Sequence, residues 1–389
     1  MKNLRFFLHI CNFCSTFVPD FTMRKYGLFI VYALALVAFP AQAQVSNAGS
    51  SVFNFLSLPA SAHINALGGS NVSLSNGEVA LGMCNPSLLH PTGHMVLQLN
   101  YSYYLPGTMF ASALYQHNFG RSPIEAPYAG DGEPDKPNYF AVGFHYLDYG
   151  KMRYADKDGN LTGGTFGARD ILIDIMYARQ LGPLFKVGVT LKPVYSIYES
   201  YTSFALGADV GAHFQTADST FQMGLVLQNI GWQLKGFYSQ EGGSNHEMMP
   251  LNLQLGLTYR IPKTPIRLHM QIHNMQTWNL NYEWTSREKS TITGDYVSHD
   301  IKWYDMLFRH TIFTLEIVPK SEKFYVALSY NHRRRAELNL VDQRSVAGLS
   351  LGAGVRIKQV RVDFAISQMT KSNFSYQAGL SLDINSLLK

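Results

Sequence analysis

The stretch Pro250–Arg260, PLNLQLGLTYR, alternates without a break between apolar residues and residues that are polar or glycine. Its apolar positions are Leu251, Leu253, Leu255, Leu257 and Tyr259, and its other positions are Asn252, Gln254, Gly256, Thr258 and Arg260. Successive side chains of a strand point to opposite faces, so this pattern predicts a strand with one apolar and one polar face. Its length suits a tilted strand that crosses a bilayer, which needs about 9–11 residues, better than a soluble strand of about 5–6.

The same alternation recurs along most of the chain. It is clear at 97–104, 140–147, 185–192, 204–214, 221–228, 250–260, 266–273, 324–331, 349–357, 360–367 and 374–383, and weaker at 109–118, 170–181 and 307–318. In lipid an open sheet edge would leave backbone groups unpaired, so such strands must close into a barrel. We therefore predict an all-β fold, a transmembrane antiparallel β-barrel of about 14 strands over residues 94–389. A soluble secreted sandwich or barrel with one buried face is the alternative.

Composition favours a surface that does not face water. Charged residues make up 15% of the 389 residues and aromatic residues 13%, whereas soluble proteins are about 25% charged. The polar faces are rich in Gly, Gln, Asn and Ser, which suits a crowded or hydrated barrel interior. Aromatic residues close several apolar faces, as at Tyr103, Phe214, Tyr259 and Tyr330, and this is typical of the girdles at membrane interfaces.

Residues 1–43 are predicted to be an upstream extension followed by a secretory signal peptide. A basic start at Met23–Lys25 precedes the apolar run Gly27–Phe39, and an A-x-A arrangement ends at Ala43, after which we expect cleavage. We expect Met23 to be the true start, and the alternative is a long basic region that includes residues 1–22. Export of this kind places the barrel in the cell outer membrane.

Charge and cysteine content exclude some functions. Without residues 1–43 the chain keeps 28 basic and 26 acidic residues, since four basic residues and one acidic residue are removed. This balance gives no reason to expect nucleic-acid binding. Cys11 and Cys14 form a C-x-x-C within the removed part, and Cys84 alone makes no internal disulfide.

The segment 44–93, before the first strand, is predicted to be a plug or latch inside the barrel. It is apolar but broken by proline and glycine, as at Leu58-Pro59 and Gly68-Gly69. Asn85-Pro86 suits the start of a helix, with Asn at the cap and Pro at the first helical position. An apolar segment of this length must be buried, and the lumen of a mid-sized barrel is the available place.

Connections between the strands differ in length. Residues 182–184 and 260–265 are short, whereas 120–137, 231–249 and 275–306 are long and polar. Outer-membrane barrels have short turns on one rim and long loops on the other. We expect the long connections to form an exterior recognition surface.

Two motifs that suggest chemistry fail on closer reading. Gly348–Gly352 matches G-x-S-x-G, but Ser350 stands within a strand, and a nucleophile elbow needs a sharp turn. Asp156–Asn160 is similar to the start of a calcium loop, but Leu161 and Gly167 occupy the positions that need Gly and Glu. We expect a turn there, and we predict no catalytic, cofactor-binding or metal-binding residues.

Basic and histidine residues have simpler interpretations. His269 and His273 share one strand face about 13 Å apart, at ~3.3 Å per residue, which is too far to bind one ion, so both are expected to line the lumen. Arg333, Arg334 and Arg335 follow a strand end. They contact either lipid head groups and lipopolysaccharide phosphates at the rim, or a docked partner.

Several stretches resemble a known family. FNFLSLPASAHINALGG (53–69) and NVSLSNGEVALGMCNPSLL (71–89), followed by a tyrosine-rich strand, resemble the PorV/PorQ group of Bacteroidota outer-membrane proteins, distant relatives of FadL-like fatty-acid transporters. Four further stretches are more similar to PorQ-like members: 154–170, 191–212, 227–231 and 329–340. One departure is the C-terminus, DINSLLK, because many barrels end in an aromatic residue and this chain ends in Lys389.

The resemblance implies a component of the type IX secretion system attachment complex. Such a protein anchors a PorZ-like surface protein, works with PorU/PorV-like components, and supports attachment of cargo to anionic lipopolysaccharide, without a cofactor or enzymatic activity of its own.

Two other functions stay open. One is a FadL-like channel for hydrophobic small molecules, with residues 49–92 as its hatch. A continuous apolar pocket in the lumen would favour this channel, whereas charges expected in the lumen count against it, namely Lys186, Lys192, Arg267, Arg356 and Asp363. The other is a secreted hydrolase, which rests on the Ser350 motif alone.

Overall fold

The computed structural model describes residues 52–119, 137–237, 246–280, 302–338, 346–370 and 373–388. The chain divides into two compact units, Met1–Ser46 and Asn47–Lys389, and everything below concerns the second. The predicted leader, residues 1–43, and Lys389 lie outside the described residues.

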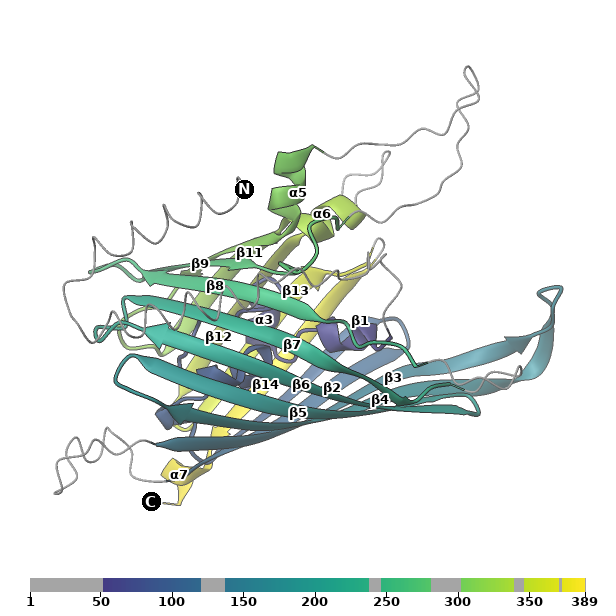
Figure 1. Ribbon diagram of the computed structural model, residues 1–389, viewed down its shortest axis with the longest axis horizontal. Helices are drawn as coiled ribbons and strands as arrows, with labels where there is room; N and C mark the ends of the chain where they lie inside the picture. The colour runs from purple at the N-terminus through teal and green to yellow at the C-terminus, as the bar shows by residue number, and fades with distance from the viewer. Residues whose placement is uncertain are drawn as a thin grey trace, which may run out of the picture. The chain divides into compact units, whose positions relative to one another are not determined.

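Within the described ranges, fourteen antiparallel strands close into one barrel (Figure 1). They are β1 Val96–Leu105, β2 Thr108–Phe119, β3 Asn138–Ala155, β4 Leu161–Gln180, β5 Phe185–Tyr198, β6 Tyr201–Gln215, β7 Phe221–Lys235, β8 Asn252–Arg260, β9 Ile266–Ile272, β10 Thr311–Ile317, β11 Phe324–Asn331, β12 Leu349–Ile357, β13 Val360–Gln368 and β14 Phe374–Asp383. Each strand pairs with its sequence neighbours, and β1 pairs with β14 to close the ring. The predicted antiparallel barrel of 14 strands is confirmed.

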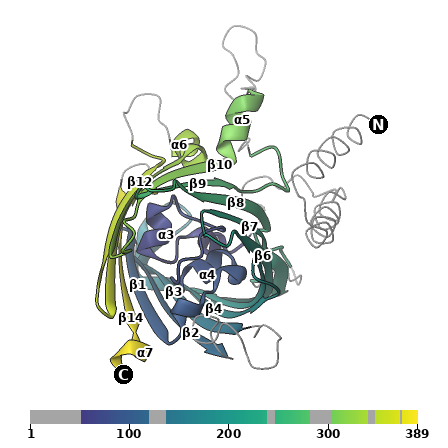
Figure 2. The same ribbon diagram turned by 90° about the vertical axis from the view of Figure 1, so that its left-hand side faces the viewer.

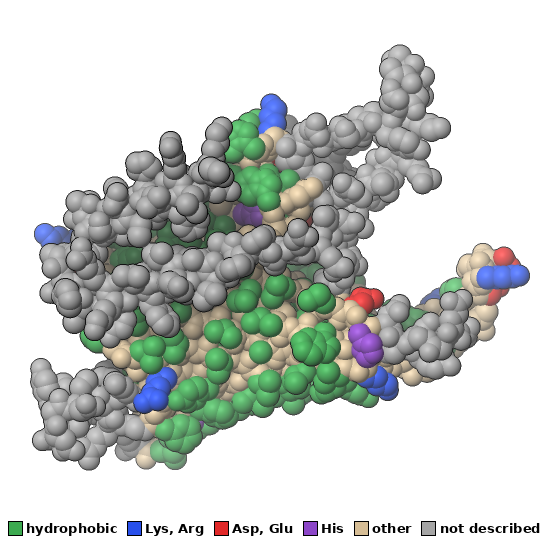
Figure 3. All heavy atoms as spheres, viewed as in Figure 1, with side chains coloured by type: hydrophobic (Ala, Val, Ile, Leu, Met, Phe, Trp, Pro, Cys, Tyr) green, Lys and Arg blue, Asp and Glu red, His purple; other side chains and the backbone are tan. Residues whose placement is uncertain are grey.

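The two faces of the strands separate as the alternation predicts. In β8, Gln254 and Thr258 are buried inside the barrel, whereas Leu257 and Tyr259 point outward. Figure 3 shows hydrophobic side chains spread over the outer wall. They include Leu99, Val189, Val210, Leu268, Leu315, Leu328, Leu351, Val362 and Phe364, each more than a third exposed. A continuous apolar outer surface of this extent belongs in lipid, and the architecture is that of an outer-membrane-type β-barrel.

The wall is tall on one side and short on the other. Strands β3 and β4 have 18 and 20 residues, whereas β9 and β10 have 7 each. The pairing of β3 with β2 ends at Asp148, and the pairing of β4 with β5 ends at Ala168. Residues 149–167, here called the ribbon, therefore continue as a two-stranded hairpin that projects beyond the barrel at the right of Figure 1. The ribbon was not predicted from the sequence.

The tip of the ribbon is a tight turn. The Asp156 carboxylate accepts hydrogen bonds from the backbone N–H groups of Asp158 (2.9 Å) and Asn160 (2.8 Å). This is an Asx-type turn, in which a short carboxylate replaces backbone partners. The predicted turn at 156–160 is confirmed.

The two rims of the barrel carry different connections. The start of β1 pairs with the end of β14, and the turns 181–184, 216–220, 261–265, 318–323 and 358–359 lie at this same short-turn rim. The connections 236–251, 273–310 and 332–348 lie at the opposite, long-loop rim. β2 ends and β3 begins at the short-turn rim, and the predicted long loop at 120–137 lies outside the described residues except for Pro137. The chain changes rim at every crossing, and loop length alone does not reveal this.

The helices of the described residues are short. They are α3 Ala62–Ala66, α4 Leu81–Cys84, α5 Trp303–Arg309, α6 His332–Leu338 and α7 Ile384–Leu387, with 3-10 turns η1 Asn54–Ser57, η2 Pro86–Leu88 and η3 Pro91–Gly93. None of them is long and apolar enough to cross a membrane. The weak strand prediction over 307–318 is correct only from Thr311, because α5 occupies the residues before it.

Residues 52–93, here called the luminal segment, lie inside the barrel. Figure 2, viewed along the barrel, shows α3 and α4 within the ring of strands. The segment supplies much of the buried apolar core, including Ile64, Leu67, Leu74, Leu81, Leu88 and Leu89. That it acts as a plug or latch stays a prediction.

Candidate functional site

Lumen-facing glycines let the luminal segment approach the wall. A Cβ atom at Gly188 of β5 would lie 2.6 Å from the carbonyl carbon of Pro86 and the nitrogen of Ser87. Gly211 of β6 faces the Asn85 side chain in the same way, and Gly224 of β7 faces the carbonyl of Val72. The luminal segment therefore packs against the glycine-rich inner faces that the sequence shows. A side chain at these three glycines would collide with the segment.

Asn85 and Pro86 begin a helix, as their sequence predicts, although it is a single 3-10 turn. The Asn85 carboxamide accepts from the backbone N–H of Ser87 (3.1 Å) and donates to the carbonyl of Val72 (2.9 Å). Pro86 stands at the first position, where no N–H is needed. This cap joins the turn to the preceding part of the luminal segment and sets it against β5 and β6.

The other predicted plug residues contact different strands. The carbonyl of Pro59 accepts from the Gln377 carboxamide of β14 at 3.0 Å. Leu58 packs against an apolar cluster described below. Gly68 and Gly69 have φ values of 98° and 105°, a left-handed turn that glycine adopts readily.

The three arginines at 333–335 do not act as one group. Arg334 reaches into the barrel, where its guanidinium donates to the carbonyl of Gly68 (3.5 Å) and the hydroxyl of Ser350 (3.3 Å). These contacts give Arg334 a role within the chain, and partner contact by it stays a prediction. Arg333 is partly exposed and pairs with Glu337 at 2.6 Å, and Arg335 lies against Gly348. Partner contact by Arg333 and Arg335 stays a prediction.

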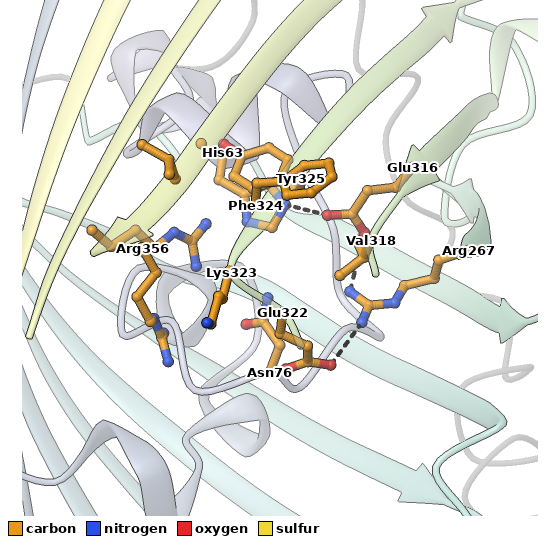
Figure 4. Close-up of a pocket in the computed structure, with 13 residues that line it drawn as sticks. His63, Asn76, Arg267, Glu316, Val318, Glu322, Lys323, Phe324, Tyr325 and Arg356 are labelled. Atoms are coloured by element: carbon orange, nitrogen blue, oxygen red, sulfur yellow. Dashed lines mark hydrogen bonds and ion pairs between the residues drawn. The ribbon is translucent and has the colours of Figure 1, made fainter. Parts of the chain in front are cut away.

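A buried ion network ties the luminal segment to β9–β13, here called the short wall, and Figure 4 shows the part of it in which Glu316 contacts His63 and Arg267. Its members are His63 and Glu78 of the segment with Arg267, His269, Glu316, Arg361 and Asp363 of the strands. His63 contacts Glu78 through Nδ1, and its Nε2 lies 3.1 Å from Glu316 of β10. The guanidinium of Arg361 of β13 donates to Glu78 at 3.1 Å. Removing one partner of such a buried pair leaves an uncompensated charge and is strongly destabilising.

The charges of this network favour the ionised forms of its luminal members. Burial lowers the pKa of His63, but Glu78 and Glu316 outweigh it and raise that pKa to about 9. Burial acts to raise the pKa of Glu78, but His63 and Arg361 outweigh it and hold that pKa well below its usual range. At neutral pH both side chains are therefore charged, and they bind the segment to the wall.

A small cavity of about 30 Å³ adjoins the network at the short-turn rim. Figure 4 shows Lys323 and Arg356 beside it, together with His63 and Tyr325. The cavity is large enough for water rather than for an organic ligand. Among the described residues, no group of three or more His, Cys, Asp or Glu side chains could hold a metal ion.

The remaining predicted polar residues also contact the interior. His269 lies 2.9 Å from the hydroxyl of Thr258, and His273 is buried. Lys186 donates to the Ser75 hydroxyl and to the Leu89 carbonyl, both at 2.9 Å. Lys192 pairs with Asp209 at 2.6 Å. Both lysines face the lumen, as predicted; Lys186 binds the luminal segment, and Lys192 joins β5 to β6.

At the long-loop rim the interior is apolar instead. Phe110, Leu147, Leu172, Val194 and Ala205 point inward from β2 to β6 and, with Met249, form one buried cluster, here called the apolar chamber. Phe53 and Phe55 of the luminal segment fill it, with their rings edge-to-face at 6.5 Å. Inner faces of membrane barrels are usually polar, so these inward apolar side chains could contact an apolar ligand if Phe53 and Phe55 left them.

The residues that fill and border the chamber have unusual features. Phe53 has φ 60° and ψ 43°, a left-handed conformation that is rare for a bulky side chain. Tyr149 packs against the chamber, and its hydroxyl donates to Asp170 at 2.7 Å. The hydroxyls of Tyr198 and Ser196 donate to the same carboxylate. A buried carboxylate with three hydroxyl partners thus borders the apolar chamber.

Sequence reasoning missed the chamber. Alternation placed Leu147 on the inner face of its strand, but a single leucine there carried no signal. Val194 lies on the inner face of β5 beyond the alternating stretch 185–192, and Ala205 lies on the inner face of β6 within the stretch 204–214, where a single alanine carried no signal. A search for inward apolar residues that lie side by side on neighbouring strands would have found the cluster. Such a search needs the pairing register of those strands, which the sequence pattern does not provide.

Comparisons with known proteins give structural similarity only. No family model matches the chain, and no curated protein does. The crystal structure of the Pseudomonas putida toluene transporter TodX aligns with 83% of this chain and 97% of its own, at 13% identity and a TM-score of 0.48. The CymD monoaromatic hydrocarbon channel covers 85% and 97% (12%, 0.41), and a Pseudomonas aeruginosa FadL homologue 81% and 96% (11%, 0.39). Identities this low do not indicate the ligand of this chain.

Proposed function

We propose that the protein is an outer-membrane channel that binds hydrophobic small molecules in the apolar chamber. The observation that carries this proposal is a buried apolar cluster at the long-loop end of the barrel interior, in which Phe53 and Phe55 of the chain itself pack against inward side chains of β2 to β6. The two rings occupy a place that an apolar ligand would take. When no ligand is bound, the two rings keep water out of the chamber. Contact between water and its apolar walls would be unfavourable.

The segment that fills the chamber can leave without breaking the ion network. The backbone N–H groups of Leu56 and Leu58 donate within the segment, to Phe53 and Phe55 at 3.0 Å each. The network with the short wall begins only at His63. The left-handed backbone of Phe53 costs free energy in the resting state, which displacement would release. We infer that residues 53–58 swing out when a ligand enters, while residues 59–93 stay fixed.

A binding experiment with a double variant tests this function. Phe53→Ala with Phe55→Ala should bind an anthroyloxy-labelled stearate tighter than the natural protein does, because the ligand no longer displaces two buried rings. Burying one such ring is worth about 1.5–3 kcal/mol, so roughly tenfold tighter binding is expected. Binding is followed by probe fluorescence on purified protein in detergent.

Two further variants make the result specific. Ala205→Phe fills the chamber and should abolish binding, whereas Phe364→Ala, on the outer face of β13, should leave it unchanged. Absence of saturable binding in the natural protein and in the double variant would overturn the proposal. Binding that survives Ala205→Phe would place the ligand elsewhere.

A second candidate function is anchoring of a surface protein, in the manner of the PorQ-like attachment component. It is supported by the ribbon, which projects from the long-loop rim, and by the ion pairs inside the barrel near the short-turn rim. The partners would be a PorZ-like surface protein and PorU/PorV-like components, with lipopolysaccharide around them.

Deleting residues 275–306 tests the anchoring candidate. The deletion should leave the barrel in the membrane and release the partner to the medium. Affinity purification from detergent-solubilised outer membranes, before and after the deletion, identifies what is held. A partner retained at normal barrel levels would count against anchoring by these loops.

A further inference from the structure

Helix α5 turns its apolar face away from the protein. Trp303 is 69% exposed and Phe308 47%, and Tyr304 and Leu307 are exposed as well. The opposite face holds buried Met306 and Asp305, whose carboxylate lies 2.8 Å from both His332 and Arg309. A helix that packs on a soluble domain buries its apolar stripe and exposes its charges. The reversed order indicates that the outer face of α5 does not face water.

The position of α5 places this face at the edge of the lipid-facing wall. The helix ends at Arg309, and β10 begins two residues later at the long-loop rim. Figure 2 shows α5 outside the ring of strands and directed away from the barrel axis. The outward side chains Phe313 and Leu315 follow along β10, each about two-fifths exposed. The apolar surface of α5 therefore continues the apolar surface of the barrel.

Basic side chains accompany this surface. Lys302 precedes α5, and its ammonium lies 5.8 Å from the ring centroid of Tyr304. Arg333 and Arg335 stand on α6, which is joined to α5 by the ion pair of His332 with Asp305. In Figure 3 hydrophobic side chains gather around this projection. Aromatic rings beside lysine and arginine are typical of segments that lie in a membrane interface, where phosphates face the cations.

We propose that α5 and α6 form an interfacial anchor that rests on the outer leaflet around the barrel. The side chains of Trp303, Tyr304, Leu307 and Phe308 enter the boundary between head groups and acyl chains, about 5–10 Å deep for such helices. Lys302, Arg333 and Arg335 face the phosphates of anionic lipid. The occupant of this surface is thus lipid, because the surface is continuous with the lipid-facing wall and opposite in charge to the head groups.

Depth-dependent quenching of one tryptophan tests the anchor. The chain has four tryptophans, Trp232, Trp278, Trp284 and Trp303. A protein that keeps only Trp303, with the others changed to Phe, is reconstituted into phosphatidylcholine–phosphatidylglycerol vesicles with or without brominated phosphatidylcholine. Bromine should quench Trp303 strongly, to within about twofold of a protein that keeps only Trp232, which is 59% exposed on the outer face of β7.

Matched controls decide between lipid and other occupants. Asn160→Trp in a tryptophan-free background places the reporter at the tip of the ribbon, beyond the wall, and should escape quenching. Lys302→Gln with Arg333→Gln should reduce Trp303 quenching in anionic vesicles, with little change in neutral ones. Cooperative unfolding of each variant shows that the barrel is intact. A Trp303 that is no more quenched than the ribbon reporter overturns the proposal and makes α5 a surface for a protein partner.

Discussion

At the residue scale, His63 links the luminal segment to two strands of the short wall. It joins Glu78 of its own segment to Glu316 of β10, and its ring lies 4.3 Å from that of Tyr325 on β11. Folding raises the pKa of His63 from 6.5 to about 9, so the folded state favours its protonated form. The stability that this gives is complete below about pH 6.5 and is lost as pH rises through 9.

Glu78 sets the other limit of this pH range. Its pKa is lowered from 4.5 in the folded state by His63 and Arg361, which outweigh the opposing effect of burial. Its contribution is therefore present above about pH 4.5 and is lost as pH falls further. The attachment of the luminal segment to the wall should be strongest between these limits, at mildly acidic pH.

The change His63→Gln tests this electrostatic attachment. At pH 6 it should lower the free energy of unfolding by roughly 3–5 kcal/mol, the usual cost of breaking a buried ion pair. The difference from the natural protein should shrink towards pH 10, where His63 is neutral. Urea unfolding in lipid micelles across this range measures it, with His117→Gln on the outer face of β2 as the control. A stability difference that stays constant with pH would show that the charge of His63 does not contribute to the stability of the protein.

At the scale of elements, the alternation of apolar and polar residues predicted the strands well. Outward side chains of a strand face lipid, whereas the side chains between them make polar contacts inside the barrel. The alternation failed where the backbone departs from a regular strand. In β7, Gln228 and Asn229 both turn inward at a bulge, and Asn229 has φ 58°. The carboxamide of Gln228 donates to the carbonyl of Cys84 at 2.7 Å, and the Asn229 N–H donates to Asp209 at the same distance.

The interior could be predicted only in outline. The sequence indicates that residues 44–93 need burial, but their partners are far away along the chain. His63 and Glu316, for example, are 253 residues apart. Such contacts depend on the register of all fourteen strands, which alternation does not determine. The ribbon and α5 were missed for a related reason, since each lies outside the belt that produces the alternating pattern.

A glycine variant tests how closely the luminal segment and the strands fit. Gly188→Val should destabilise the protein by about 1–3 kcal/mol, the usual cost of overpacking, because its side chain meets the backbone at Pro86 and Ser87. Gly182→Val, in the turn before β5, is the control, since no described atom lies within 4 Å of a Cβ there. Thermal unfolding in detergent compares the two. Equal stabilities would mean that the segment does not sit against β5.

At the scale of the whole molecule, the tall and short walls have different roles. The tall wall, β2 to β7, carries the apolar chamber and the ribbon. The short wall, β9 to β13, carries the ion network on its inside and is followed by α5 and α6 at the long-loop rim. The luminal segment runs between them, with the ion network on the short wall and with Lys186 and the apolar chamber on the tall wall. Movement of residues 53–58 would thus open the tall side alone.

Arginine scanning of the outer surface tests whether lipid surrounds the whole barrel. Leu315 lies midway along β10, opposite Leu268 and Leu328 of the neighbouring strands. Leu315→Arg should lower stability in lipid by about 2–4 kcal/mol, because the charge lies near the bilayer midplane. Ile357→Arg, at the short-turn rim, should cost about 0–1 kcal/mol.

Folding into lipid vesicles at several urea concentrations measures both costs. Both side chains point outward, and Leu315 is 41% and Ile357 66% exposed, so the two sites differ mainly in depth. Equal costs, or a protein that stays folded and monodisperse in buffer without detergent, would contradict a lipid-facing wall. The channel, the anchored partner and the interfacial helices all require that wall, so this measurement bears on each of them before any ligand or partner is identified.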